Sequence, residues 1–231
     1  MRTQKIISSS VFQKYLMAAS GLGLVGFVIT HLLGNLLLYR SEGTAFNNYA
    51  HGLEGLGGLL YAAEFGLLGI AILHVIVALT LTLKKRRARS TGYSSVLRSK
   101  GGKSKSNLSS RYMAVSGSIL LIFIVLHVIH FKYGPGIAEG YSVDIKGETA
   151  RDLHRYVVEE FQKPLYVGLY AGVMVFLGFH LRHGFWSAFQ SLGTNSPKYS
   201  KPIYALGVAL ALLLSTGFLC IPLWIYFGAS R

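Results

Sequence analysis

The chain has 231 residues, of which 52% are hydrophobic and only 14% are charged, and its formal net charge is +14. Soluble domains carry roughly 25% charged residues, and the hydrophobic residues here fall into long blocks, so the composition excludes an ordinary soluble protein. The lone Cys220 excludes a disulfide framework, a cysteine-ligated iron–sulfur cluster and a cysteine-based zinc site.

Five blocks of the sequence are long enough to cross a bilayer as helices, which takes roughly 20 apolar residues. They do not alternate in polarity as the strands of a membrane barrel do, and no internal repeat is apparent. The expected fold is all-α, a polytopic membrane protein whose five transmembrane helices form one bundle and a single membrane-anchor domain over residues 1–231. The expected spans are about 15–39, 55–83, 112–131, 164–192 and 203–228.

The distribution of Lys and Arg predicts the orientation of the spans. The loop 84–111 holds ten basic residues and no acidic one, whereas acidic and basic residues are nearly balanced in the loop 132–163. Cytoplasmic loops carry the excess of Lys and Arg, so we expect loop 84–111 and the N-terminus in the cytoplasm, and loop 132–163 and the C-terminus outside. The basic run is interpreted as a topology signal beside anionic lipid, not as a nucleic-acid site, and it could also dock an acidic partner.

The outer loop carries one periodic segment. Leu153, Tyr156, Val157 and Phe161 recur at helical spacing with charged residues between them. This pattern predicts an interfacial amphipathic helix that caps the outer face.

Histidines lie inside the predicted spans, where ionisable side chains are costly and usually mark a working site. Each of the first four spans holds at least one, and the fifth holds none. The six histidines concerned are His31, His74, His127, His130, His180 and His183.

The depths of these histidines predict two pairs. His31, His74, His127 and His180 each lie about 24 Å along their helices, at ~1.5 Å per residue. Because neighbouring spans run in opposite directions, His31 and His127 fall near the outer face, and His74 and His180 near the inner face.

One imidazole on either side of a flat macrocycle suits six-coordinate haem iron, so we expect two b-type haems. With both axial positions filled, such irons transfer electrons and do not activate ligands. Zinc is a poorer interpretation, because it takes three or four ligands at one depth. His130 and His183 follow His127 and His180 by three residues on the same helix face, and depth alone does not choose within either pair.

Other side chains are candidates for contacts around these cofactors. Arg182 and His183 lie near the inner boundary, where they could hold a haem propionate. Glu64 is the only acidic residue inside a span, and quinone chemistry needs a proton donor or acceptor beside an apolar slot. We therefore expect a quinone site with Glu64, His51 and Asn47, the alternative for Glu64 being a protonated carboxyl bonded to a neighbouring helix.

Three stretches carry a family resemblance: Thr30-His31-Leu32, Phe46-Asn47-Asn48-Tyr49-Ala50-His51 and the segment from Phe179 to Trp186. With the five spans and four spaced histidines, nearly the whole chain resembles the b558 dihaem cytochrome b that forms the membrane anchor of bacterial succinate dehydrogenases and fumarate reductases. The resemblance implies that His31 and His127 ligate the outer haem and that His74 and His180 ligate the inner haem. It favours His127 over His130, and His180 over His183.

The same resemblance implies the surroundings of the chain. The family's anchor lies in the bacterial cytoplasmic membrane and holds an FAD-containing flavoprotein and an iron–sulfur subunit on the cytoplasmic face, with a dimer of heterotrimers as one possible assembly. Electrons pass between the iron–sulfur subunit, the two haems and a quinone, usually menaquinone, so the chain is an electron-transfer subunit without catalytic residues for dicarboxylates. The alternatives are a dihaem anchor of a hydrogenase or formate dehydrogenase, and a proton-coupled transporter with a histidine relay.

Overall fold

The computed structural model describes residues 9–40, 43–87, 112–194 and 196–228. In this part of the chain, five helices are long and apolar enough to cross a membrane. The prediction of an all-α polytopic membrane protein is therefore confirmed. The five helices are α2 (Ser10–Asn35, continued by η1, Leu36–Tyr39), α4 (Gly58–Arg87), α6 (Met113–His127, continued by η2, Val128–Lys132), α8 (Pro164–Ser191) and α9 (Pro197–Gly228).

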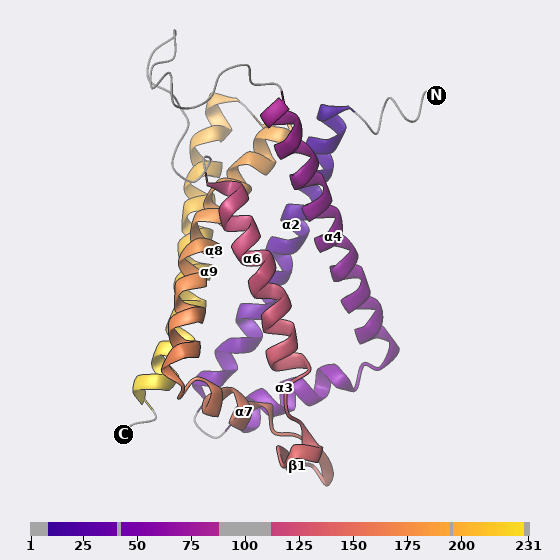
Figure 1. The fold of residues 1–231 in the computed structure, drawn as a ribbon, viewed down its shortest axis with the longest axis vertical. Helices are drawn as coiled ribbons and strands as arrows, with labels where there is room; N and C mark the ends of the chain where they lie inside the picture. The colour runs from indigo at the N-terminus through magenta and orange to yellow at the C-terminus, as the bar shows by residue number, and fades with distance from the viewer. Residues whose placement is uncertain (1–8, 41–42, 88–111, 195, 229–231) are drawn as a thin grey trace.

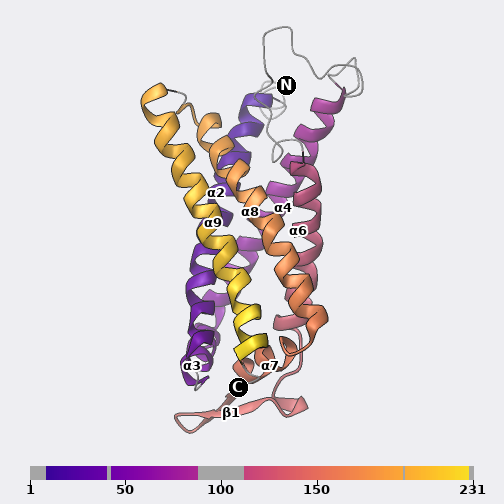
Figure 2. The same cartoon turned by 90° about the vertical axis from the view of Figure 1, so that its left-hand side faces the viewer.

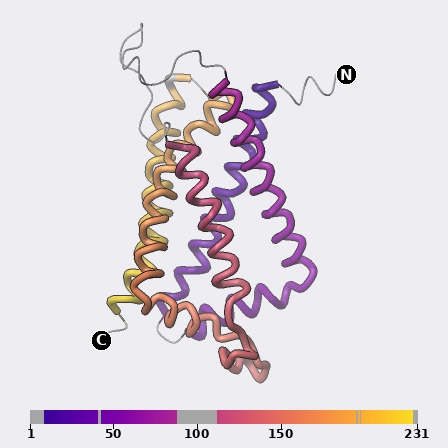
Figure 3. Tube along the Cα trace, viewed as in Figure 1, coloured from indigo at the N-terminus to yellow at the C-terminus, as the bar shows by residue number. Residues whose placement is uncertain are grey.

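The spanning helices run alternately in opposite directions, as the chain trace shows (Figures 1 and 3). Helix α8 packs along α9, α2 packs against α4 and α8, and α6 packs against α8. Figure 2 shows α8 and α9 side by side, with α2 behind α9. Helices α4 and α6 leave most of their apolar side chains exposed within the chain, as is expected where lipid, a cofactor or a partner covers them.

Helix ends differ from the predicted spans at three places. Helix α2 begins at Ser10, and α4 continues to Arg87, since basic side chains in the last turn interact favourably with the helix dipole. Helix α9 begins at Pro197 and contains Pro202 and Pro222. The last helix therefore begins before residue 203, where the predicted span begins, and it continues through Pro202. Membrane helices tolerate an internal proline when neighbouring groups satisfy the freed carbonyl.

One end of the bundle, called here the hairpin end, is covered by short elements. Helix α3 (Thr44–Glu54) and helix α7 (Leu153–Glu160) pack together there. The predicted amphipathic helix is confirmed as α7, in which Tyr156 and Val157 are buried. Helix α3 and the antiparallel hairpin of β1 (Ser142–Ile145) and β2 (Glu148–Arg151) were not predicted.

The hairpin turn has a signal in the sequence. Lys146 and Gly147 both have positive φ, 56° and 87°, which is the conformation of a two-residue turn that matches strand twist. The backbone N–H of Gly147 donates to Asp144 Oδ1 at 3.1 Å. A lysine–glycine pair between alternating residues was therefore the available evidence for the hairpin.

The apolar core lies towards the hairpin end, where α2, α8 and α9 meet the short elements. Its buried members come from six segments of the chain. They are Leu32, Leu38, Phe46, Val157, Phe161, Val167, Tyr170, Leu214, Ile221 and Ile225.

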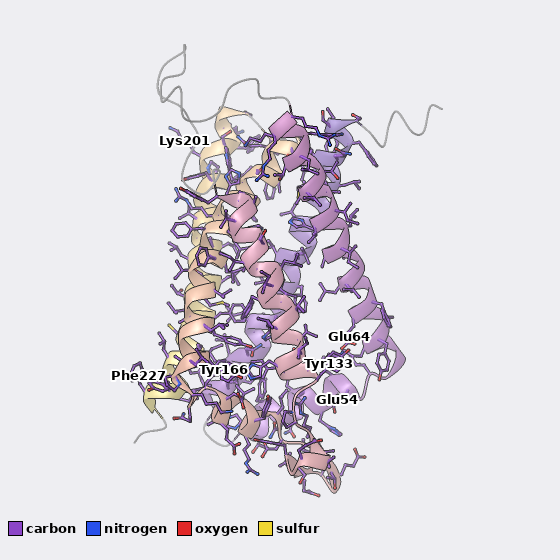
Figure 4. All side chains as sticks on the ribbon, in the orientation of Figure 1. Glu54, Glu64, Tyr133, Tyr166, Lys201 and Phe227 are labelled. Atoms are coloured by element: carbon purple, nitrogen blue, oxygen red, sulfur yellow. The ribbon has the colours of Figure 1, made fainter. Side chains whose placement is uncertain are left out.

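The predicted basic loop falls mainly on residues 88–111, which lie outside the described residues. Its first residues, Lys84 to Arg87, form the last turn of α4. They lie at the end opposite the hairpin, as Lys201 does in Figure 4. The predicted orientation across the membrane stays a prediction.

Candidate functional site

His31 of α2 and His127 of α6 lie together towards the hairpin end. Their ring centroids are 5.8 Å apart, and the ring planes are nearly perpendicular at 83°. Aromatic rings surround the pair: Phe27 and Phe218 lie against His31, and Phe123 lies against His127, with centroids 5.4 to 5.7 Å apart. The structure thus brings together two histidines that are far apart in the sequence, as the depth argument predicted.

His74 of α4 packs against Ser20 and Gly21 of α2. Its Nδ1 lies 3.1 Å from Ser20 Oγ, and a Cβ on Gly21 would lie 3.3 Å from its Cε1. Ser20 Oγ also donates its one proton to the carbonyl of Leu16 at 2.7 Å. The hydroxyl must therefore accept from His74 Nδ1–H, which leaves the Nε2 lone pair available as a ligand.

His180 of α8 is seated on α6 in the same way. Its Nδ1 lies 3.2 Å from Ser116 Oγ, which also donates to the carbonyl of Met113 at 3.2 Å, and a Cβ on Gly117 would lie 3.3 Å from its Cε1. Both rings therefore have Nδ1 occupied and Nε2 available, and their pairing at one depth stays a prediction.

The serine–glycine contacts of His74 and of His180 repeat one local arrangement. The sequence reads Met-Ala-Ala-Ser-Gly at 17–21 and Met-Ala-Val-Ser-Gly at 113–117, and the same spacing leads from each serine to His31 and to His127. The expectation that there is no internal repeat is wrong at this level. Each of α2 and α6 supports a histidine of its neighbouring helix at one depth and presents its own histidine at the other.

A hydrogen-bonded chain extends from His127 towards the surface of the hairpin end. Tyr170 Oη lies 3.4 Å from His127 Nδ1 and 3.1 Å from His130 Nδ1. His130 Nε2 lies 3.0 Å from Glu160 Oε2, and Lys163 Nζ donates to Glu160 Oε1 at 2.6 Å. His130 is therefore bonded to a carboxylate and a tyrosine, and the structure gives it a role other than that of His127.

The separation of His31 and His127 fits an iron held by both rings, and the Nδ1 contacts of His74 and His180 fit two further ligands. An iron bonded to one nitrogen of each of two imidazoles, at ~2 Å, holds the ring centres about 6 Å apart, close to the separation of His31 and His127. The hydrogen bonds of His74 and His180 use Nδ1, so Nε2 of each ring remains available to bind iron. Among the described residues, histidines, cysteines and acids form no group of three or more that could hold a metal ion.

A buried guanidinium donor lies at the end opposite the hairpin. Arg182 Nη2 donates to Tyr204 Oη at 2.6 Å, whereas its Nε is buried and has no hydrogen-bond partner among the described residues. His183 follows Arg182 in α8 and is partly buried. A carboxylate such as a haem propionate would satisfy the Nε donor, and this observation supports the expected role of Arg182.

The three candidates for a quinone site do not converge on one point. Glu64 pairs with Lys132 at the end of η2, and Figure 4 shows Glu64 near Tyr133 at the hairpin end. The Asn47 side chain donates to Asp152 Oδ1 and accepts from the backbone N–H of His154, both at 2.8 Å. His51 pairs with Glu148 at 3.2 Å. Asn47 and His51 therefore attach α3 to the hairpin and α7, and their part in a quinone site stays a prediction.

Comparison with known protein families, curated proteins and solved structures finds no match to this chain. Sequence reasoning missed the contacts of Ser20, Ser116, Tyr170 and Glu160. The repeated serine–glycine pair was a usable signal for the first two. Tyr170 and Glu160 had no signal, because only the fold brings α7, α8 and η2 together.

Proposed function

We propose that the chain is the membrane-anchor cytochrome b of a succinate/fumarate:quinone oxidoreductase. It carries electrons between an iron–sulfur subunit and a quinone through two haems b. In this proposal His31 and His127 hold the haem near the hairpin end, which faces outward, and His74 and His180 hold the haem near the cytoplasmic end.

One observation carries the proposal: His31 and His127 lie with ring centroids 5.8 Å apart, and towards the other end of the bundle His74 and His180 each present an Nε2 for which the described residues show no hydrogen bond. Two ligands per site is the number that a six-coordinate haem takes from the protein. Unpaired ionisable groups are costly in a membrane, so four imidazoles arranged in this way require a cofactor or a proton pathway.

The residues of the chain perform the positioning in this function. Bound haems would supply reversible one-electron chemistry, and His31 with His127 and His74 with His180 would hold them. Ser20 and Ser116 fix the tautomer of the inner ligands, and the small Gly21 and Gly117 let those rings approach the backbone of the facing helix.

The partners are assigned to the end opposite the hairpin. The described part of that end carries Lys14, the basic turn 84–87, Lys198 and Lys201. We propose that it faces the cytoplasm and binds the flavoprotein and iron–sulfur subunits. Menaquinone is then the expected quinone on the hairpin side, where Glu64 of α4 forms an ion pair with Lys132.

The test uses the complex purified with its partners. We expect a reduced-minus-oxidised spectrum of low-spin haem b with two haems per chain. The variants His74→Ala and His180→Ala should each lose one haem and keep the other, whereas His31→Ala and His127→Ala should lose the other one. His154→Ala, outside the spanning helices, is the matched control and should keep both.

Colourless protein from an assembled complex, or variants that keep both haems, would contradict the proposal. The electron donor separates it from the related alternatives. Succinate should reduce the haems, whereas reduction only by hydrogen or formate would assign the chain to another dehydrogenase. A chain without haem that moves protons with a solute would be a transporter.

A further inference from the structure

We propose that Glu160 is a positioning residue for the haem at the hairpin end, acting through His130 and Tyr170 on the ligand His127. The inference rests on the proposed function. Its physical content is a hydrogen-bond chain that holds a proton on His127 Nδ1 and places a negative charge at the far end of the chain.

The direction of each hydrogen bond follows from the surface inwards. Glu160 as a carboxylate only accepts, so His130 Nε2–H donates to Glu160 Oε2 across 3.0 Å. In the neutral ring His130 Nδ1 is then the acceptor, and Tyr170 O–H donates to it across 3.1 Å. The Tyr170 oxygen is left to accept from His127 Nδ1–H, at 3.4 Å.

The direction also follows from the ligand outwards, and the two arguments agree. A histidine that binds metal through Nε2 carries its proton on Nδ1 and donates it to a neighbouring group. Tyr170 must then accept from His127 and donate onwards, and His130 Nδ1 is the acceptor within its reach. The chain thus has one consistent polarity from the ligand to the carboxylate.

The ionised state of Glu160 is supported by its neighbours. Burial acts to raise the pKa of the Glu160 carboxyl, but hydrogen bonds from Lys163 and His130 outweigh it, and the pKa lies below the usual value of 4.5. The residue is only 7% exposed. Replacing a buried ion pair by apolar residues often costs no stability, so packing alone does not explain a carboxylate at this place.

His130 is held rigidly between the two ends of the chain. Its ring is stacked between Phe131 and Tyr166, with centroids 4.4 and 4.5 Å away, and its carbonyl accepts from Tyr156 Oη at 3.1 Å. It lies in the π-helical turn η2, and such turns are frequent at functional sites. Because the His130 ring is held on both sides, it keeps its hydrogen bonds to Glu160 and to Tyr170 at the same time.

The chemical consequence differs between the two pairs of ligands. His74 and His180 donate to neutral hydroxyls, whereas the bond from His127 leads to an anion. An acceptor with negative charge behind it makes the imidazole a stronger donor to the metal. The oxidised haem gains more from this than the reduced haem, so breaking the chain should make the haem at the hairpin end easier to reduce.

The experiment is a potentiometric titration of the complete complex carrying Tyr170→Phe or Glu160→Gln. We expect the potential of the hairpin-end haem to rise in both variants, and more in Tyr170→Phe, where the link itself is removed. A tenfold change in the reduction equilibrium, about 59 mV for one electron, is the expected upper size. The potential of the other haem should stay unchanged.

Two variants serve as matched controls. Tyr166→Phe keeps the ring stacked on His130 and removes a hydroxyl for which the described residues show no hydrogen bond. Glu159→Gln changes the neighbouring acid of α7, which bonds to Tyr141 and Arg155 and not to His130. Both should leave the two potentials as they are, with both haems present.

The outcomes separate this inference from the proposed function. Unmodified complex without two haems contradicts the proposed function itself. With two haems present, an unchanged hairpin-end potential in Glu160→Gln and Tyr170→Phe, or equal shifts of both haems, overturns the role of Glu160. If Tyr170→Phe fails to hold the haem, Glu160→Gln decides alone, because it preserves the shape of the side chain and removes its charge.

Discussion

Ser20 and Ser116 offer the sharpest quantitative prediction about the inner ligands. Each hydroxyl accepts one hydrogen bond from a histidine Nδ1, at 3.1 and 3.2 Å, because its own proton is donated to a helix carbonyl. A neutral hydrogen bond contributes about 1 kcal/mol. If the oxidised haem gains that much more than the reduced one, Ser20→Ala raises the midpoint potential of the inner haem by up to about 40 mV.

Ser116→Ala should have a similar effect, and the double variant about twice the shift, since the serines act on different rings from different helices. The assay is a redox titration followed at the α-band of each haem. Ser118→Ala is the control, because its hydroxyl bonds only to the carbonyl of Ala114 among the described residues. An inner potential that does not move, or a shift confined to the other haem, would refute the reasoning.

Two further predictions concern the hairpin end. Gly134→Ala should destabilise the protein by about 1–3 kcal/mol and lower its thermal unfolding midpoint, because the new Cβ would collide with the carbonyl of His130 and lie 2.8 Å from Tyr156 Oη. Gly136→Ala is the control, since the nearest atom to its Cβ would be 3.8 Å away. Equal unfolding midpoints of the two variants would contradict this prediction. Acid should loosen the same end in two steps, measured as protease cleavage within 132–163. Burial, opposed by Asp152, lowers the pKa of His154 below 6.5, so the stability from its neutral ring is complete above pH 6.5 and is lost as the pH falls through the lowered value. Glu160, with its pKa below 4.5, loses its contribution further down, and cleavage independent of pH would refute both steps.

The sequence was sufficient for the spans and for bringing His31 and His127 together, because both follow from length and depth. Hydrophobic blocks must cross the bilayer as helices, and alternating directions fix which histidines share a depth. The ring contact of His31 with His127 agrees with that reasoning. Helix ends were less predictable, as Pro202 shows, because a proline near a helix start and one inside a membrane helix look alike in the sequence.

The polar partners of the histidines could not be predicted in the same way. Each depends on the rotation of one helix against another, and periodicity does not set that rotation. Tyr170 reaches His127 and His130 only because α8 packs beside α6. Asn47 and His51 were expected beside a quinone, yet the fold uses them to attach α3 to α7 and the hairpin.

Comparing the two halves of the chain indicates where the two sites diverge. At the end opposite the hairpin, Ser20 with Gly21 and Ser116 with Gly117 contact their histidines in the same way. At the hairpin end, the position that follows His31 as His130 follows His127 is Gly34, and Tyr49 of α3 occupies the space a side chain there would need.

Glu54 precedes α4 by the same spacing as Glu160 precedes α8, but without a histidine at position 34 it has no equivalent of the chain through His130. The half of the chain with α6 and α8 therefore carries the hydrogen-bonded link to a carboxylate, and the half with α2 and α4 does not. The proposed ligands His31 and His127 are thus held unequally. His130 stands where the first half has Gly34, and Tyr170 lies at the place in α8 that Glu64 holds in α4. Replacing His130 with a small residue should accordingly remove the influence of Glu160 on His127.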